Sequence, residues 1–216
     1  MRTWDRVRRD LLLPFRFPAL FALSLGYSGL LYAASLKAGF LDVRSPYWVV
    51  SAGGLLLLSP VYHGVILPAI ASALRGERIA WRGALRPAFD RFARLFLGEL
   101  VVGAAVIVGA LLLVLPGVYI GMRWIYYKQA IVLGGMPLSE AVRESIRKSR
   151  DGPSTVRLFV SLAGLYGCAV GLDALLVRYA TEPVVHLGAV VATALALTWM
   201  NVVVTSQYTA PQAGET

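Results

Sequence analysis

Residues 111–152 read LLLVLPGVYIGMRWIYYKQAIVLGGMPLSEAVRESIRKSRDG. One apolar run ends at Pro116-Gly117, a second begins at once, and a charged segment follows from Leu138. Because proline and glycine together are a strong turn signal, the pattern predicts two long apolar helices joined by almost no loop. Arg123 and Lys128 interrupt the second run, and charges in hydrocarbon need partners or a functional reason. The stretch therefore predicts a helical hairpin within a membrane bundle.

The composition of the whole chain also indicates a membrane protein. Of its 216 residues, 57% are hydrophobic and 15% are charged, whereas about a quarter of a soluble domain is charged. The mean hydropathy is +0.66. Cys168 is the single cysteine, which excludes an intramolecular disulfide and a cysteine-rich metal site.

Apolar segments of membrane-crossing length recur along the chain. Roughly 20 apolar residues cross a bilayer core of about 30 Å. The first segment is too long for a cleaved signal peptide, and residues 11–17 form its interfacial lead-in. We therefore expect an all-α polytopic membrane protein, with one domain over residues 1–208 and a short tail over 209–216. The six expected transmembrane helices are 18–38, 47–73, 95–115, 118–136, 156–177 and 184–206.

The basic residues predict the orientation of these helices. Residues 1–16, 75–94 and 137–157 hold 16 of the 21 lysines and arginines, and the opposite loops hold three. Basic residues accumulate in cytoplasmic loops, so we expect both termini in the cytoplasm. The net charge of +9 then reflects topology and attraction to anionic lipids, and we expect no binding of nucleic acid.

Two of the basic segments have amphipathic patterns. In residues 138–150, Leu138, Val142 and Ile146 recur every four residues, which predicts a helix lying in the cytoplasmic headgroup layer. Residues 79–92 show a similar stripe, which we expect Pro87 to break because proline removes a helical hydrogen bond. The alternative for each segment is an ordinary connecting helix packed on the end of the bundle.

A weak internal repeat relates these two regions. Residues 68–70 (PAI), 83–86 (GALR) and 94–96 (RLF) resemble residues 129–131 (QAI), 140–143 (EAVR) and 157–159 (RLF). Internal symmetry is common in transport proteins, but duplicated hairpins also build other bundles and chance matches occur.

The stretch from Leu115 to Ser149 resembles a signature of a bacterial six-helix membrane group. That group includes the membrane domain of glycerophosphodiester phosphodiesterases and YciC-like proteins of unknown function. The resemblance lies in the Leu-Pro-Gly turn, Arg123-Trp124, the Gly134-Gly135 turn and the SEAxxxS-like helix. It implies a six-helix architecture in the cytoplasmic (inner) membrane of a bacterium. The chain lacks the soluble catalytic domain of the phosphodiesterases, so that activity does not carry over.

Few polar side chains fall within the expected helices. There is no HExxH, P-loop or GxGxxG motif, so we expect no enzyme activity, no metal and no cofactor. Arg123 and Asp173 have matching expected depths and could pair, whereas Glu99 and Lys128 are further candidates for structural or lipid contacts. His63 is a candidate axial ligand for haem or chlorophyll, against the alternative of a histidine hydrogen-bonded between helices.

Three functions remain open from these observations. The main expectation is a noncatalytic inner-membrane scaffold, accessory subunit or lipid-contacting module, with anionic lipids and a membrane-protein partner or second copy as its contacts. A small-solute or ion transporter is the second reading, because of the repeat and the intramembrane charges. A cofactor-binding subunit of an energy-converting complex is the third, and it depends on His63.

Overall fold

The computed structural model describes residues 10, 12–38, 46–79, 81–112, 114–150, 152–179 and 183–210, and within these ranges it is helical with no strand. Residues 12–16 form a short helical segment before α2. The long helices are α2 (Pro18–Ala38), α3 (Pro46–Leu74), α5 (Phe92–Leu112), α9 (Gly152–Tyr179) and α10 (Pro183–Tyr208). The short helices are α4 (Trp81–Asp90), α6 (Val114–Arg123), α7 (Tyr127–Val132) and α8 (Leu138–Lys148).

Several helices begin where the sequence places a proline. Pro18, Pro46 and Pro183 are the first residues of α2, α3 and α10, and Pro137 is the N-cap residue of α8. The ring fixes φ near the helical value, and the first turn has no intrahelical partner for the missing N–H. Local sequence therefore sets these boundaries.

Among the described residues, three helical segments are long and apolar enough to cross a membrane: Leu56–Leu74, Phe92–Leu112 and Leu187–Tyr208. Shorter apolar helical segments occur at Pro18–Ala33 and Thr155–Leu165. The chain is therefore an all-helical, membrane-embedded protein, as the composition predicts.

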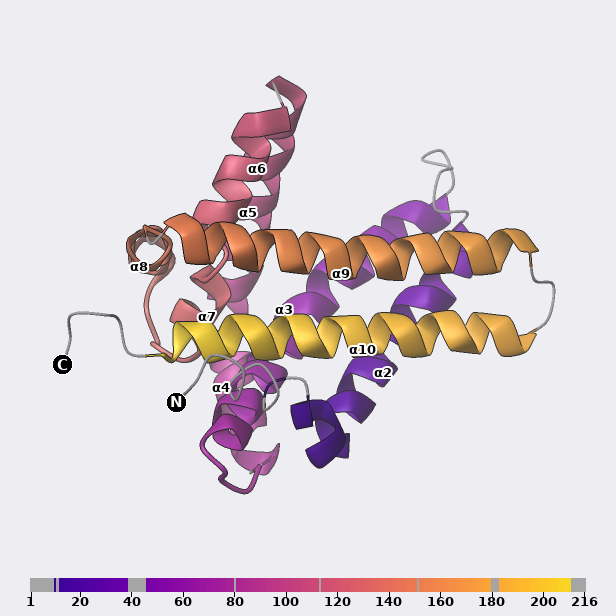
Figure 1. Cartoon of the computed structure of the whole chain (residues 1–216), viewed down its shortest axis with the longest axis horizontal. Coiled ribbons are helices and arrows are strands. Elements are labelled where there is room, and N and C mark those ends of the chain that lie inside the picture. Colours follow the sequence, from indigo (N-terminus) through magenta and orange to yellow (C-terminus); the bar gives the residue numbers. More distant parts are fainter. Residues whose placement is uncertain are drawn as a thin grey trace.

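The helices form a bundle from which one hairpin projects. Helices α9 and α10 run side by side, with α2 and α3 packed against α10 (Figure 1). Helix α8 is seen end-on beside the start of α9, whereas the α5–α6 hairpin extends away from α9 and α10 (Figure 1). The outer half of α5 and most of α6 are therefore outside the bundle.

The expected turn at Pro116-Gly117 is wrong. Helix α5 ends at Leu112 and α6 begins at Val114, so Pro116 and Gly117 lie inside α6. Gly117 instead provides the close contact between the helices, since a Cβ there would lie 2.7 Å from the backbone nitrogen of Ala110. The glycine thus allows α6 to pack directly against the backbone of α5.

The expectation of one continuous helix over residues 118–136 is also wrong. Helix α6 ends at Arg123, residues 124–126 form a turn, and α7 ends at Val132. With 10 residues, α6 is about 15 Å long, which is half of a bilayer core. Hydropathy alone does not reveal this break, because its residues are as apolar as those of the helices beside it.

The two amphipathic segments form helices with different boundaries from those expected. Helix α8 covers most of residues 138–150, but Ala141 and Ser145 are its fully buried side chains, and Val142 and Ile146 are half-buried. Helix α4 continues through Pro87 to Asp90, so the expected break there is wrong. The helix loses one hydrogen bond at the proline and still extends to Asp90.

The main core lies between α2, α3, α7 and α10. Its buried members include Leu20, Ile66, Ile70, Ile131 and Val202. Ala69 and Ile70 of one apparent repeat and Ala130 and Ile131 of the other share this core. The two similar sequence segments thus meet in the fold, where each contributes small and branched apolar side chains.

Some sequence predictions concern parts outside the described residues. These are the basic residues of positions 1–9, the tail beyond residue 210, and the side chain of Asp173.

Candidate functional site

Two groups of polar side chains stand out from the apolar bundle. The buried charge cluster consists of Ser59, His63, Glu99 and Lys128, from α3, α5 and α7. The arginine pocket is lined by Tyr119, Ile120, Arg123, Trp124, Ile146 and Arg150. The first group joins three of the residues singled out from the sequence, and the second contains Arg123.

Glu99 is the centre of the buried charge cluster. Its Oε1 lies 2.9 Å from Lys128 Nζ and accepts a hydrogen bond of 2.6 Å from the Ser59 hydroxyl. The Glu99 and Lys128 side chains are 11% and 23% exposed. In an environment with little water, each charge provides the other with the partner that burial requires.

His63 completes this cluster through its ring nitrogens. Nδ1 lies 2.8 Å from the Ser59 carbonyl oxygen, and a carbonyl can only accept, so Nδ1 carries the proton. Nε2 is then the acceptor, and Lys128 Nζ lies 3.4 Å from it and 3.3 Å from Nδ1. Lys128 therefore lies beside both ring nitrogens, whereas an axial ligand to haem needs one free nitrogen. This geometry favours the histidine hydrogen-bonded between helices.

Aromatic hydroxyl groups continue the network toward α2 and α10. Tyr62 stacks on Tyr27 with 4.2 Å between ring centroids, and its hydroxyl lies 2.9 Å from Ser24 Oγ. Asn201 Nδ2 donates to the same hydroxyl at 3.4 Å. Polar contacts thus link α2, α3 and α10 beside the charges on α5 and α7.

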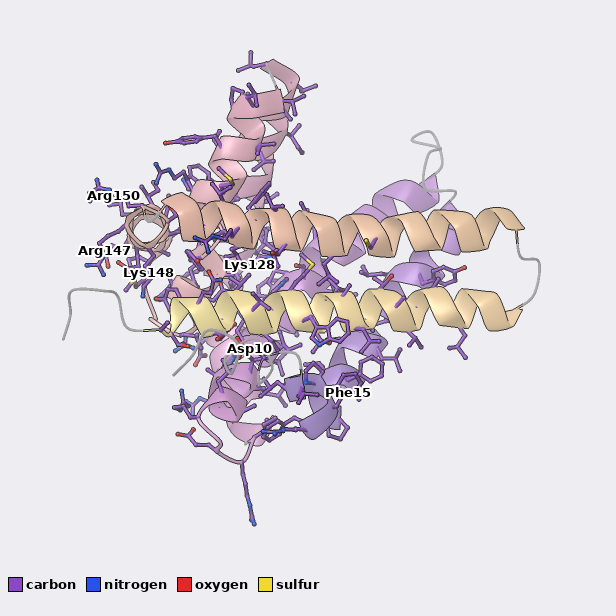
Figure 2. All side chains as sticks on the ribbon, in the orientation of Figure 1. Asp10, Phe15, Lys128, Arg147, Lys148 and Arg150 are labelled. Carbon is purple, nitrogen blue, oxygen red and sulfur yellow. The ribbon has the colours of Figure 1, made fainter. Side chains whose placement is uncertain are left out.

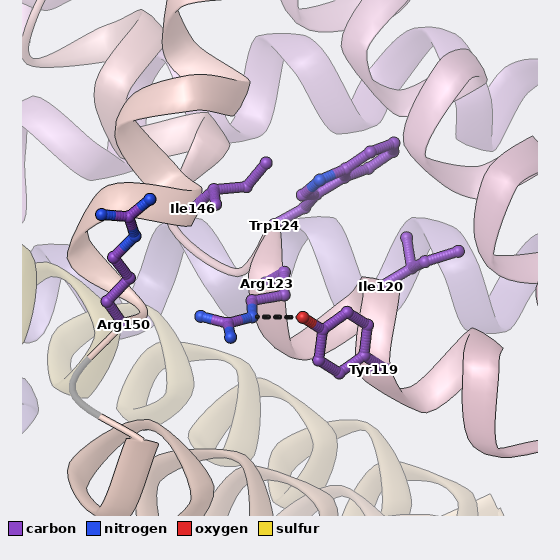
Figure 3. Close-up of a pocket in the computed structure, with 6 residues that line it drawn as sticks. All are labelled: Tyr119, Ile120, Arg123, Trp124, Ile146 and Arg150. Atoms are coloured by element: carbon purple, nitrogen blue, oxygen red, sulfur yellow. Dashed lines mark hydrogen bonds between the residues drawn. The ribbon is translucent and has the colours of Figure 1, made fainter.

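The arginine pocket lies where α6 meets α8. Its volume is about 300 Å³, and Figure 3 shows the Arg123 side chain beside the Tyr119 ring. Arg123 Nε donates to the Tyr119 hydroxyl at 3.1 Å, and Nη1 donates to the Ser149 carbonyl at 3.1 Å. Arg150 enters from the end of α8 and is exposed. The pocket therefore combines two cations with aromatic and branched apolar walls.

The structure does not bring Arg123 and Asp173 together. Arg123 contacts Ser149, just before α9 begins at Gly152. Asp173 lies 21 residues further along that helix, which corresponds to about 31 Å. The sequence predicted equal depths for Arg123 and Asp173, but α6 ends beside α8, at the end of the bundle where α9 begins. Asp173 lies far along α9 from that end.

Backbone groups at the break between α6 and α7 are satisfied by α8. Ser145 Oγ accepts a hydrogen bond of 3.0 Å from the Tyr126 N–H and donates one of 3.0 Å to the Arg123 carbonyl. Ser149 Oγ lies 3.3 Å from the same carbonyl. Interrupted helices within membrane proteins need such partners because lipid provides none.

Two arginines perform the corresponding role at the end of α7. Arg91 donates to the Val132 carbonyl, and Arg94 donates to the Gly135 carbonyl at 3.0 Å. Cations are favourable at helix C-termini, where the carbonyl groups lack intrahelical partners. Arg91, between α4 and α5, thus holds the end of α7, and Arg94 of α5 holds the loop that follows it.

Basic side chains gather around α8 at one end of the bundle. Figure 2 shows Arg147, Lys148 and Arg150 near α8, whereas Lys128 lies further inside. Lys148 Nζ donates to the Tyr208 carbonyl at 2.9 Å and thereby caps α10. The end of α10 and the basic helix α8 therefore lie at the same end of the protein.

Ser59, Tyr119 and Arg150 were not predicted as site residues. Tyr119 is one helical turn before Arg123, and this spacing is the signal that would have found it. Ser59 is likewise one turn before His63 on α3, although its contact with Glu99 comes from another helix. Arg150 could not be assigned from spacing, because Tyr119 and Arg123 come from another helix.

No protein-family model matches this chain, and its comparisons with curated proteins and with solved structures give no match. The resemblance of residues 115–149 to a bacterial six-helix group stays a prediction.

Proposed function

We propose that this protein is a noncatalytic, lipid-contacting module of a bacterial inner membrane, with both termini in the cytoplasm. The observation that carries the proposal is the α5–α6 hairpin, whose projecting end is apolar and exposed. Leu111 is 81% exposed and Leu115 is 79% exposed, and Ile107, Leu112 and Val114 are each more than half exposed. Exposed apolar patches of this kind mark membrane or protein contacts.

Polar groups at the base of the same hairpin favour lipid as the contact. Arg123 and the arginine pocket lie eight residues from Leu115 along α6, or about 12 Å. Half of a hydrocarbon core is about 15 Å, so a hairpin inserted along the membrane normal would place its tip among acyl chains and its base near the headgroups. Helix α8, with its exposed basic side chains, extends the headgroup contact.

This proposal and the prediction of six membrane-spanning helices differ in where they place Leu115. If α5 and the following segment crossed the whole membrane, Leu115 would lie near water at the far surface. In our proposal Leu115 lies in hydrocarbon. The basic residues near α4 and α8 still lie on one side, in keeping with the positive-inside rule.

Spin labels test the position of the hairpin tip. In a Cys168→Ser background reconstituted into liposomes, cysteines at positions 115 and 139 would carry the label, since Ser139 is exposed on α8. We expect the label at 115 to be relaxed by oxygen and protected from a water-soluble nickel reagent, with the opposite result at 139. Access of the nickel reagent to position 115 would contradict the proposal.

Proton-coupled transport is the second candidate function, because the buried charge cluster joins three ionisable side chains from three helices. Such clusters within membranes are used in proton relays. Proteoliposomes containing a pH-sensitive dye would test it. Proton flux that is present in the wild type and lost in Glu99→Gln would favour transport over the lipid-contacting role.

A further inference from the structure

The arginine pocket is large enough to hold a small charged group. Its volume of about 300 Å³ lies at the lower end of the range for ligand sites in proteins. Tyr119, Ile120, Arg123 and Trp124 come from α6 and the turn after it, and Ile146 and Arg150 come from the other side (Figure 3). The site is thus built by two segments that the fold brings together.

The charges in this pocket are not balanced by the described residues. No described carboxylate forms an ion pair with Arg123 or Arg150. Arg123 uses Nε and Nη1 for Tyr119 and Ser149, and no hydrogen bond from Nη2 to a described residue is present. A guanidinium keeps its charge in essentially any protein setting, so these two groups favour an anion in the pocket.

The position of Arg123 is fixed before any ligand binds. Its guanidinium carbon lies 5.2 Å from the centroid of the Tyr119 ring, and the Ser149 carbonyl holds Nη1. A preorganised guanidinium loses less side-chain entropy on binding, and its planar arrangement of donors matches a phosphate group. Arg150, by contrast, is exposed and can adjust to the ligand.

The surroundings of the pocket indicate that its anion has an apolar part. Val118 and Tyr119 are 38% and 54% exposed, and they continue the pocket wall toward the apolar hairpin tip at Leu115. Ile120 and Ile146 add branched apolar surface inside the pocket. A free phosphate ion has no apolar part to pack against this surface, whereas the acyl chains of a lipid would cover it.

We propose that the arginine pocket binds the phosphate group of a phospholipid headgroup, with Arg123 and Arg150 as hydrogen-bond donors and the acyl chains along α6. This inference rests on the proposed lipid-contacting function and adds a specific site to it. A phospholipid headgroup and free inorganic phosphate both carry a phosphate anion, so free phosphate is the alternative ligand.

Native mass spectrometry in mild detergent tests the site, with phosphatidylglycerol as the probe. The variants are Arg123→Gln/Arg150→Gln and, as a control with the same net charge, Arg78→Gln/Arg86→Gln, whose side chains are exposed outside the pocket. We expect one tightly bound phosphatidylglycerol on the wild type and on the control. The pocket variant should bind it about tenfold more weakly or worse, because both charged hydrogen-bond donors are lost.

Two single variants test the site even if Arg123→Gln/Arg150→Gln fails to fold. Arg150→Gln removes an exposed side chain and should fold normally, with weaker binding of the lipid. Arg123→Lys retains a charge but loses the planar donor arrangement, so it should also bind more weakly. Equal lipid binding by these variants and the wild type would overturn the proposal.

Competition with inorganic phosphate separates the two sources of the anion. A large excess of inorganic phosphate should leave phosphatidylglycerol bound if the acyl chains contribute. Displacement of the lipid by phosphate would overturn the lipid assignment and identify a free-phosphate site. The two proposals can fail separately. If the spin label places the hairpin tip in hydrocarbon but the pocket variants bind lipid normally, only the lipid site is refuted. If the tip is exposed to water, the lipid-contacting function itself is refuted.

Discussion

Ser145 Oγ of α8 lies 3.0 Å from the backbone nitrogen of Tyr126, 19 residues earlier in the chain. The same hydroxyl donates to the Arg123 carbonyl, so one side chain satisfies a donor and an acceptor on either side of the break between α6 and α7. Ser145 is fully buried. Helix α8 therefore stabilises the break between α6 and α7 that precedes it in the sequence.

Replacement of this serine should destabilise the protein. In Ser145→Ala, the Tyr126 N–H loses the hydroxyl that accepts from it, whereas the Arg123 carbonyl keeps the Ser149 hydroxyl. Loss of a buried hydrogen-bond partner costs about 1–3 kcal/mol. Ser139→Ala, on the exposed side of α8, is the matched control and should have little effect. Unfolding in mixed detergent micelles measures the difference, and equal stability of the two variants would show that the hydroxyl is dispensable.

The break itself could not be predicted from the sequence. Residues 118–136 form one apolar segment by hydropathy, and nothing within that segment indicates a turn at residues 124–126. The partners that stabilise the turn are Ser145 and Ser149, which come from a different helix. Their spacing of four residues was visible in the sequence, but which helix they face is decided by tertiary packing.

The charged residues also show that the sequence indicates which residues need partners but not which residues pair. The cost of placing charges in hydrocarbon drew attention to Glu99 and Lys128 individually, because each needs a partner. Their pairing depends on which helices are neighbours, and expected depth suggested Arg123 with Asp173 instead. Apolar patterning, by contrast, is a local property, and it gave the bounds of α2, α3 and α10 to within two residues.

The contact between Gly117 and α5 yields a second prediction. A Cβ at position 117 would lie 2.7 Å from the Ala110 nitrogen and 2.9 Å from the Val106 oxygen, which are backbone atoms that cannot rotate away. Gly117→Ala should therefore destabilise the hairpin by about 1–3 kcal/mol, as overpacking generally does.

Gly103, on the same hairpin, provides the control for this substitution. Apart from the neighbouring backbone of α5 itself, no described atom lies within 4 Å of a Cβ built there, so Gly103→Ala should be neutral or should stabilise α5 by up to about 1 kcal/mol through helix propensity. Thermal unfolding of the two variants should thus shift in opposite directions. A shift of the same sign and size for both would mean that the close approach of α6 to α5 is absent.

The ion pair between Glu99 and Lys128 leads to the third prediction, which a double-mutant cycle tests. Their charged atoms lie 2.9 Å apart with little exposure to water. Removing one partner leaves an uncompensated charge, which costs about 3–5 kcal/mol for a buried pair. We therefore expect Glu99→Gln and Lys128→Met each to destabilise the protein more than the double variant does.

The exposed pair of Arg75 and Glu77 is the control for this cycle. Its charged atoms are as close, at 2.8 Å, but both side chains are more than half exposed, so water replaces a lost partner and the pair contributes little. Neutralising either residue should leave the unfolding transition almost unchanged. Strictly additive losses for Glu99→Gln and Lys128→Met would show that these residues are held independently, for instance by Ser59 and His63. A double variant more stable than either single variant would identify the ion pair as the contact that fixes α7 against α5.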